Sequence, residues 1–163
     1  MKKRRFFALF LVLGLLVSLL SVPASAFEEI DIDARAALLV EKETGEILYE
    51  KNAHEKNYPA SITKLTVALL VFEAIDAGQL SLDQPITAHE SAFEGLSIYG
   101  STAGIKVGEV LTVEQLLQCM LIVSANEACN ILAEAVCGEG NISQFVQRMN
   151  ERAAALGCEN THY

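Results

Sequence analysis

The chain has 163 residues, and 12 Lys and Arg stand against 21 Asp and Glu, which gives a formal net charge of −9. The first 26 residues hold four of the basic side chains and no acid, so residues 27–163 carry −13 by themselves. A chain this acidic repels phosphate backbones, and its basic residues form no further run, so we expect no nucleic-acid partner. A hydrophobic content of 52% is too high for a disordered chain, and a packed core is expected.

Residues 1–26 have the composition of a secretory signal peptide. Residues 2–5 are basic, residues 6–22 are mostly apolar, and residues 24–26 supply the small side chains that a signal peptidase needs. An uncleaved membrane anchor is the alternative, but an apolar run of 17 residues is short for a bilayer span. We therefore expect an exported protein that acts in the cell envelope, at the outer face of the cytoplasmic membrane or secreted.

The first elements expected after this segment are two strands and a long helix. Residues 36–41 and 46–50 are short apolar runs on either side of a turn that contains Gly45, which predicts a β-hairpin. A helical pattern then begins at Pro59 and ends at Gly78. Its apolar positions recur with the helical period at Ile62, Leu65, Leu69, Phe72 and Ile75. Because residues 65–72 carry no charge, we expect this helix to be buried almost all round.

The second half of the chain is predicted to be helical after a loop. Residues 80–103 are polar and rich in turn formers, so an irregular loop is expected there, on the surface or at the rim of a site. Helices are expected at 112–123, where Thr112 is the cap, and at 127–136 and 142–156. The pattern therefore predicts one hairpin followed by a mostly helical body.

Four cysteines permit two disulfides in an exported protein, with three possible connectivities. Cys129 and Cys137 cannot pair with each other, because eight residues of helix would separate them by roughly 12 Å. The neighbouring side chains are apolar, so we expect small buried thiols at Cys119, Cys129, Cys137 and Cys158. No His lies at metal-ligand spacing from them, and no metal site is expected.

Ser61 and Lys64 are the first candidate site residues. They lie three positions apart at the start of an apolar helix, so their Cβ atoms should be roughly 5 to 6 Å apart on one face. A serine hydroxyl becomes a nucleophile when a base takes its proton, and a lysine in a desolvated environment can be that base. The alternative is ordinary structure, in which Ser61 caps the helix and Lys64 faces solvent.

A second polar segment, Ser124-Ala125-Asn126, lies about 60 residues further on between two predicted helices. A hydroxyl and an amide at a buried junction make sense if both point into a cleft shared with Ser61. The alternative is a structural turn, in which Ser124 caps a helix and Asn126 satisfies backbone groups.

Together these segments resemble the N-terminal part of the serine D-alanyl-D-alanine carboxypeptidases, the low-molecular-mass penicillin-binding proteins of the S11 peptidase type. Residues 59–65, Pro-Ala-Ser-Ile-Thr-Lys-Leu, resemble the P-A-S-x-T-K-[LIM] motif of that family, and residues 124–128 resemble its S-x-N element. Residues 107–113 and 156–162 are supporting matches. The resemblance implies an α+β fold of the β-lactamase and penicillin-binding-protein transpeptidase type, here an N-terminal β-hairpin plus the helical part.

The resemblance also implies a role for each candidate residue. Ser61 would be the nucleophile acylated by peptidoglycan pentapeptide stems and by β-lactam antibiotics, and Lys64 would accept its proton. Ser124 would relay a proton to the leaving amine, while Asn126 would bind the substrate amide and orient Lys64. No cofactor and no metal is implied. The alternatives are a serine β-lactamase, for which no acid can be assigned the deacylation role, and a non-catalytic envelope protein that binds peptidoglycan.

One family motif, K-[ST]-G, does not occur in the 163 residues, and neither does the C-terminal amphipathic anchor that would give membrane association. The motif would supply a cation for the substrate carboxylate, and the residue after it a second oxyanion donor, whose loss costs on the order of 10²- to 10³-fold in rate. One hairpin also cannot form the sheet of such a domain. We therefore expect residues 27–163 to be the N-terminal portion of the catalytic domain, with the C-terminal strands missing.

Overall fold

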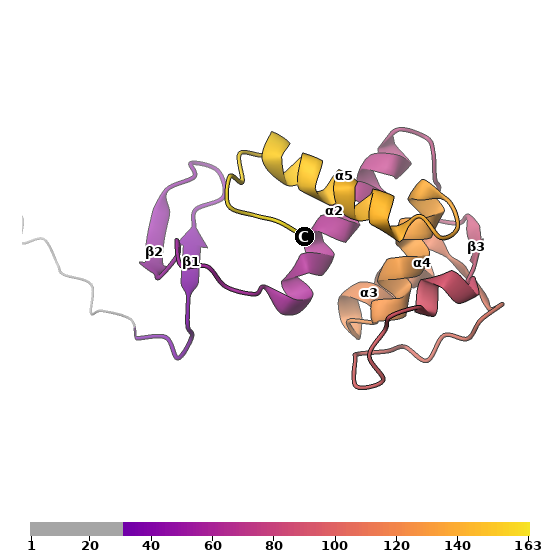
Figure 1. The fold of residues 1–163 in the computed structure, drawn as a ribbon. Helices are drawn as coiled ribbons and strands as arrows, with labels where there is room; N and C mark the ends of the chain where they lie inside the picture. The colour runs from indigo at the N-terminus through magenta and orange to yellow at the C-terminus, as the bar shows by residue number, and fades with distance from the viewer. Residues whose placement is uncertain (1–30) are drawn as a thin grey trace, which may run out of the picture. The chain divides into compact units, whose positions relative to one another are not determined.

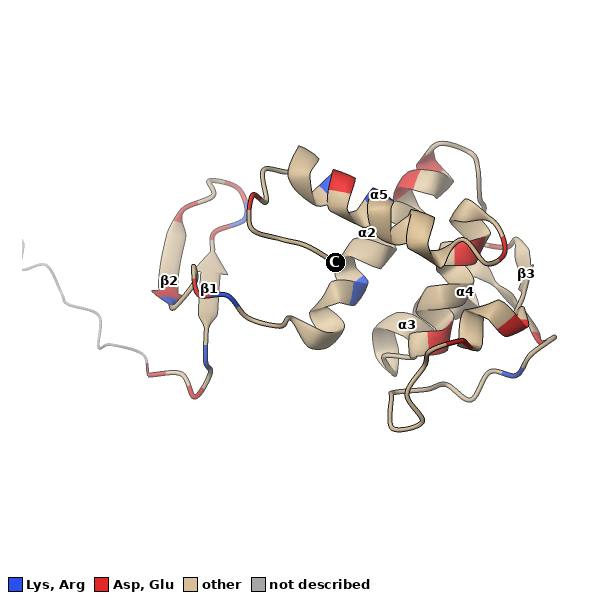
Figure 2. Cartoon of the chain, viewed as in Figure 1, with Lys and Arg blue, Asp and Glu red and all other residues tan. Residues whose placement is uncertain are grey.

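The computed structural model describes residues 31–163 (Figure 1), so the predicted signal peptide at 1–26 lies outside the described residues. The chain divides into two compact units, of which the first ends at Lys56 and the second runs from Asn57 to Tyr163. Within the described part, no helix is long and apolar enough to cross a membrane. Acidic residues occur in both units (Figure 2), whereas residues 57–163 hold four basic residues, Lys64, Lys106, Arg148 and Arg152.

The first unit contains the predicted hairpin. Strands β1 (Ala37–Val40) and β2 (Ile47–Lys51) pair antiparallel, with Leu38 opposite Glu50 and an irregularity in the register after Leu39. Gly45 in the connection has a φ of +74°, the left-handed conformation that glycine adopts without a steric penalty. The expectation of a hairpin with glycine in its turn is confirmed.

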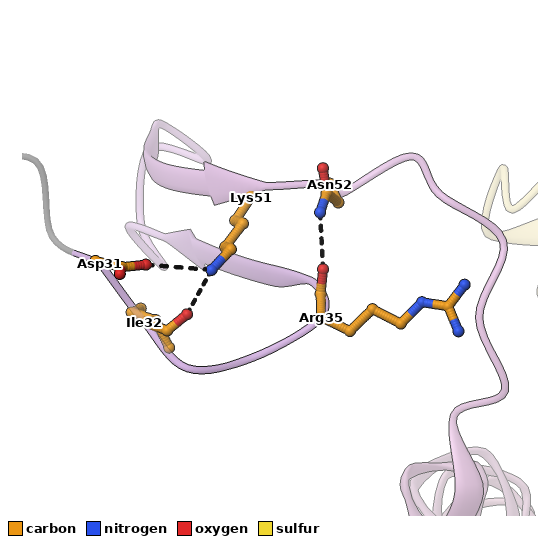
Figure 3. A network of polar contacts seen from close by, with 5 residues as sticks. All are labelled: Asp31, Ile32, Arg35, Lys51 and Asn52. Atoms are coloured by element: carbon orange, nitrogen blue, oxygen red, sulfur yellow. Dashed lines mark hydrogen bonds and ion pairs between the residues drawn. The ribbon is translucent and has the colours of Figure 1, made fainter.

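Polar contacts join the two ends of this hairpin (Figure 3). The Lys51 ammonium donates to the carbonyl oxygen of Ile32 at 2.6 Å and lies 3.3 Å from a carboxylate oxygen of Asp31. Asn52 donates from its side-chain amide to the carbonyl oxygen of Arg35 at 2.9 Å. The segment before β1 is therefore held against the end of β2.

The second unit contains most of the secondary structure of the described chain. A 3₁₀ turn, η1, precedes the first helix, and a second 3₁₀ turn, η2, lies between two short strands. The elements in chain order are η1 (Ala60–Thr63), α2 (Lys64–Asp76), β3 (Pro85–Thr87), η2 (Glu90–Phe93), β4 (Val110–Thr112), α3 (Val113–Ile122), α4 (Asn126–Cys137) and α5 (Ile142–Ala155).

Helix α4 is at the centre of the core of this unit, because it contacts α2, α3 and α5. Its apolar side chains Ile131 and Leu132 are fully buried, as are Leu116 and Met120 of α3 and Phe145 of α5. Burying a side chain of this size contributes about 1.5 to 3 kcal/mol. The packing of α3 and α4 therefore fixes the junction between them, which is the segment 123–125.

The three helices predicted in the second half are confirmed to within one or two residues at each end. Thr112 accepts a hydrogen bond from the backbone N–H of Gln115 at 3.2 Å, and the Gln115 side chain accepts one from the N–H of Thr112 at 2.9 Å. This capping box satisfies two backbone donors at the start of α3. Thr112 is thus the helix cap, as expected.

The prediction of an irregular loop over residues 80–103 is wrong in part. Strand β3 lies in this segment and pairs antiparallel with β4, so that Pro85 is opposite Thr112, and η2 follows it. Strands of three residues are too short to produce a readable alternation of apolar and polar side chains. The second two-stranded sheet therefore has no signal in the sequence pattern.

The prediction that the long helix is buried almost all round is wrong as well. Ile62 and Leu65 are 66% and 63% exposed and Phe72 is 45% exposed, although all three belong to the predicted apolar stripe. The buried side of α2 is formed instead by Lys64, Val67, Ala68, Val71 and Ala74. Because this helix is apolar on every side, its periodicity does not select the face that packs against the rest of the unit.

The four cysteines are free. Cys119, Cys129 and Cys137 are half-buried and pack against the core, so the expectation of small buried thiols is confirmed in part for these three. Cys158 is exposed, so the expectation of a buried thiol is wrong for this residue. It follows α5 in a turn closed by a hydrogen bond from its own N–H to the carbonyl oxygen of Ala153.

Candidate active site

Ser61 lies in the 3₁₀ turn η1, one turn before the first residue of α2. The N–H of Ile62 donates to the carbonyl oxygen of Pro59 at 3.1 Å, which closes the turn. Ala60 has a φ of +48°, a conformation that is uncommon outside glycine. The predicted continuous helix from Pro59 is therefore a 3₁₀ turn followed by an α-helix, and the Ser61 side chain remains exposed.

Lys64 is buried, with 8% of its surface exposed, and its ammonium group has two partners. Nζ donates to Ser61 Oγ at 3.2 Å and to Asn126 Oδ1 at 2.8 Å. The alternative in which Lys64 faces solvent is wrong. A lysine nitrogen at this distance from a serine hydroxyl is within reach of proton transfer.

Ser124 lies in the short junction between α3 and α4. Its hydroxyl donates to Ser61 Oγ at 2.8 Å, so two serine hydroxyls from segments 63 positions apart are in contact. Its φ of +62° is left-handed, which is strained for a residue with a side chain, and such strain clusters at functional sites. Ser124 does not cap α4, since the capping position is Ala125 and no side chain bonds to the helix end.

Asn126 is the first residue of α4. Its backbone N–H donates to the carbonyl oxygen of Ser101 at 2.9 Å, and its side-chain oxygen accepts from Lys64. The structure therefore brings all four predicted residues together in one hydrogen-bonded series, Asn126, Lys64, Ser61 and Ser124. The alternative of two unrelated structural turns does not explain this series.

A cavity of about 580 Å³ opens beside the series. Ser61, Lys64 and Asn126 form its polar part, and side chains of α4 and α5 form its apolar part, among them Cys129, Phe145 and Met149. Burial raises the pKa of the Cys129 thiol to about 11, while the nearby positive charge of Lys64 acts in the opposite direction. A mostly apolar cavity with a few converging polar groups is the usual form of a ligand site.

Tyr163 also lines the cavity, and no motif or periodicity in the sequence predicts it there. Its hydroxyl lies 2.7 Å from Thr66 Oγ1 of α2. Asn150 of α5 accepts a hydrogen bond from the backbone N–H of Tyr163 at 2.8 Å and donates to its carbonyl oxygen at 3.4 Å. The segment that follows α5 is therefore held against both α2 and α5.

Glu127 is a second residue near the site that sequence reasoning missed. Its side chain is buried, and Oε1 accepts hydrogen bonds from the Thr102 hydroxyl at 2.6 Å and from the N–H groups of Ala103 and Gly104 at 2.7 and 3.1 Å. Burial, the largest influence, raises the pKa of this carboxyl, but hydrogen bonds from the Thr102 hydroxyl and from backbone N–H groups, that of Ala103 among them, together outweigh burial and hold the pKa below 4.5. An acid in the first turn of a helix was the only sequence signal.

The described residues do not form a metal centre. Among them, no group of three or more His, Cys, Asp or Glu side chains could hold a metal ion.

The fold is that of penicillin-binding proteins with the β-lactamase-like fold. The D-alanyl-D-alanine carboxypeptidase DacD from Francisella tularensis superposes with a TM-score of 0.74 at 36% identity, over 83% of this chain and 32% of that chain. Penicillin-binding protein 5 from Haemophilus influenzae gives 0.76 at 28% identity, over 84% and 39%. Penicillin-binding protein D2 from Listeria monocytogenes, solved in an ampicillin-bound form, gives 0.66 at 31% identity, over 80% and 50%.

Residues 23–163 match the model of the S11 peptidase family, described as D-alanyl-D-alanine carboxypeptidase, and the chain belongs to this family. DacF of Bacillus subtilis is 35% identical over 155 residues, which are 90% of this chain and 39% of the relative. DacC of Escherichia coli is 34% identical over 135 residues, or 81% and 33%. The chain thus spans a third to two fifths of the length of these relatives.

Proposed function

We propose that this chain carries the catalytic serine of a D-alanyl-D-alanine carboxypeptidase that removes the terminal D-alanine from peptidoglycan pentapeptide stems. The observation that supports it most is the contact of the exposed Ser61 hydroxyl with a buried lysine at 3.2 Å and with a second serine at 2.8 Å. Membership of the S11 family supports the substrate class. No cofactor enters the proposal.

In the acylation step, Lys64 acts as the uncharged amine. Ser61 Oγ attacks the carbonyl carbon of the penultimate D-alanine, and the Ser61 proton passes to Nζ of Lys64, which becomes the ammonium. The carbonyl oxygen becomes an oxyanion, to which the N–H of Ser61 donates. The peptide C–N bond then breaks, and the leaving D-alanine nitrogen receives the proton from Lys64 through the hydroxyl of Ser124. Water hydrolyses the Ser61 ester in the second half of the cycle, which releases the shortened stem.

Asn126 has two roles in this proposal. Its Oδ1 accepts a hydrogen bond from Lys64 Nζ at 2.8 Å, which keeps Nζ directed at Ser61. Its side-chain N–H group is then available to the backbone carbonyl of the bound peptide. β-Lactam antibiotics acylate Ser61 by the same attack, with the lactam C–N bond in place of the peptide bond.

The location proposed for the protein is the cell envelope. A signal peptide at residues 1–26 would direct export, and the peptidoglycan substrate lies on the outer side of the cytoplasmic membrane. Association with that membrane would depend on a C-terminal amphipathic anchor of the kind that the family resemblance implies.

The experiment that tests the proposal measures D-alanine release from a diacetyl-lysyl-D-Ala-D-Ala peptide by the full chain. We expect slow release, because no K-[ST]-G motif in the 163 residues supplies the second oxyanion donor. This release should depend on Ser61 and Lys64, be unchanged in Lys106→Met, and not occur with a terminal L-alanine. Lys106 is the matched control, because it is an exposed lysine of the same unit. Loss of release in Lys106→Met, or release that persists in Ser61→Ala, would contradict the proposal.

Two other outcomes separate the alternatives. Hydrolysis of many equivalents of nitrocefin would indicate a β-lactamase, because a carboxypeptidase of this type is acylated once by a β-lactam and hydrolyses that β-lactam adduct slowly. Binding to peptidoglycan that is retained in Ser61→Ala, without release of D-alanine by the unmodified chain, would indicate a non-catalytic envelope protein.

A further inference from the structure

A side chain on Gly100 would collide with the side chain of Asn126 as it lies in the structure. A Cβ atom built on Gly100 would lie 2.6 Å from Asn126 Nδ2 and 3.1 Å from the carbonyl oxygen of Ser97. Gly100 is not among the glycines with a left-handed φ. The close contact with Asn126, and not an unusual backbone conformation, is therefore what requires glycine here.

Glu127 holds the segment that follows Gly100 against the start of α4. Its Oε1 accepts three hydrogen bonds from residues 102–104. Ser101 adds a backbone contact, since its carbonyl oxygen accepts from the N–H of Asn126 at 2.9 Å. The loop of residues 97–104 is thus fixed to Asn126 and Glu127 by four hydrogen bonds, and Gly100 lies within this fixed loop.

The orientation of the Asn126 carboxamide decides whether Lys64 has an acceptor. Lys64 Nζ donates to Oδ1, and the Nδ2 group, which is itself a donor, cannot replace Oδ1 as the acceptor of that bond. In the structure Oδ1 faces Lys64 at 2.8 Å, and Nδ2 is the atom nearest to Gly100. A carboxamide displaced or turned by a neighbouring side chain would lose its bond to Lys64.

We propose that Gly100 and Glu127 are positioning residues for Asn126. Glu127 holds the loop of residues 97–104 on the start of α4, and Gly100 allows that loop to close on the carboxamide so that Oδ1 points at Lys64. The consequence for rate rests on the proposed carboxypeptidase function, because Lys64 is the group that accepts the Ser61 proton.

The first test is a double-mutant cycle on the full chain, with the rate of Ser61 acylation by a fluorescent penicillin as the readout. Gly100→Ala should slow acylation about tenfold to a hundredfold, because a misplacement of about 1 Å has effects of that order. In an Asn126→Ala background the same substitution should change the rate by less than about twofold, since Nδ2 is gone. Equal effects in both backgrounds would overturn the proposal.

Gly95→Ala is the control for this cycle. A Cβ on Gly95 meets no atom within 4 Å, and its φ of +72° makes the substitution strained. It therefore introduces backbone strain in a nearby segment without a contact to Asn126. We expect its effect on acylation to be the same with and without the Asn126 carboxamide.

The second test uses Glu127 and does not depend on acylation. In the ¹⁵N-labelled full chain, Glu127→Ala should shift the side-chain amide resonances of Asn126, and Glu127→Gln, which keeps an acceptor oxygen, should restore them. Glu134→Ala is the matched control, because Glu134 is a buried glutamate of the same helix that accepts from the N–H of Gly140. Equal shifts in the Glu127→Ala and Glu134→Ala variants would overturn the proposal.

The two tests separate this proposal from the proposed function. If the unmodified chain is not acylated, the proposed function fails. The side-chain amide resonances of Asn126 still show whether Glu127 and Gly100 position the Asn126 carboxamide. If Gly100→Ala does not fold, the amide resonances of Asn126 in the Glu127 variants still test the proposal.

Discussion

Cys129 can report on the electrostatics of the site, because its thiol lines the same cavity as Lys64. Its Sγ donates to the carbonyl oxygen of Ala125 at 3.6 Å. Burial, the largest influence, raises the pKa of this thiol to about 11, the charge of Lys64 lowers it, and the charge of Glu127 raises it. A chain in which Cys129 is the sole cysteine allows these influences to be measured.

The expected magnitude follows from that pKa. At pH 8, a rise from 9.0 to about 11 reduces the thiolate fraction about a hundredfold. The more basic thiolate is intrinsically more nucleophilic, which raises the rate constant of the thiolate about eightfold. Cys129 should therefore react with a small disulfide about tenfold more slowly than a thiol with a pKa of 9.0, before any further slowing by restricted access.

The assay is the rate of reaction with 2,2′-dithiodipyridine between pH 7 and pH 10. The logarithm of the rate should rise with a slope near one per pH unit through the whole range, because the pKa of the thiol lies above pH 10. Lys64→Met should slow the reaction at each pH, since a positive charge that favours the thiolate is removed, and Lys106→Met should not. A rate that levels off below pH 9, or a Lys64→Met variant that reacts as fast as its parent, would refute the reasoning.

Three further predictions concern stability, measured by chemical denaturation. Ser124→Gly should be more stable than Ser124→Ala by about 1 kcal/mol, because glycine accepts the left-handed φ of +62°, and equal stability would show that this backbone is not strained. Leu132→Ala should cost about 2 to 5 kcal/mol, whereas Leu121→Ala, at a position 48% exposed, should cost far less, and equal costs would contradict the assignment of Leu132 to the core. Because the pKa of Glu127 is lowered in the folded state, its ionised carboxylate stabilises the fold above pH 4.5. This stabilisation is lost as the pH falls through the pKa that Glu127 has in the folded state. The Glu127→Gln variant should therefore lose less stability than the unmodified chain between pH 7 and pH 3.

The sequence predicts the helices of this chain well, because patterns of ten or more residues and a capping residue such as Thr112 define them. It predicts less where the physical signal is short or ambiguous. Strands β3 and β4 are three residues each, and α2 is apolar on all sides, so neither the second sheet nor the buried face of α2 could be read from the pattern.

The same distinction applies to the site. Ser61, Lys64, Ser124 and Asn126 are predictable because they occur in motifs with characteristic spacing. Gly100 and Glu127 are not, because the roles proposed for them depend on a contact between a loop and a helix start about 25 positions apart. A close approach of this kind is a property of the packed structure, and a single sequence contains no periodic signal for it.

The central claim is that Ser61 is an acylated nucleophile assisted by Lys64, and the most direct measurement is peptide mapping by mass spectrometry after prolonged incubation of the full chain with penicillin. We expect one penicilloyl adduct, on the peptide that contains Ser61. The adduct should be lost in Ser61→Ala, strongly reduced in Lys64→Met and retained in Lys106→Met. No adduct on the unmodified chain, or an adduct of equal yield in Ser61→Ala, would contradict the claim.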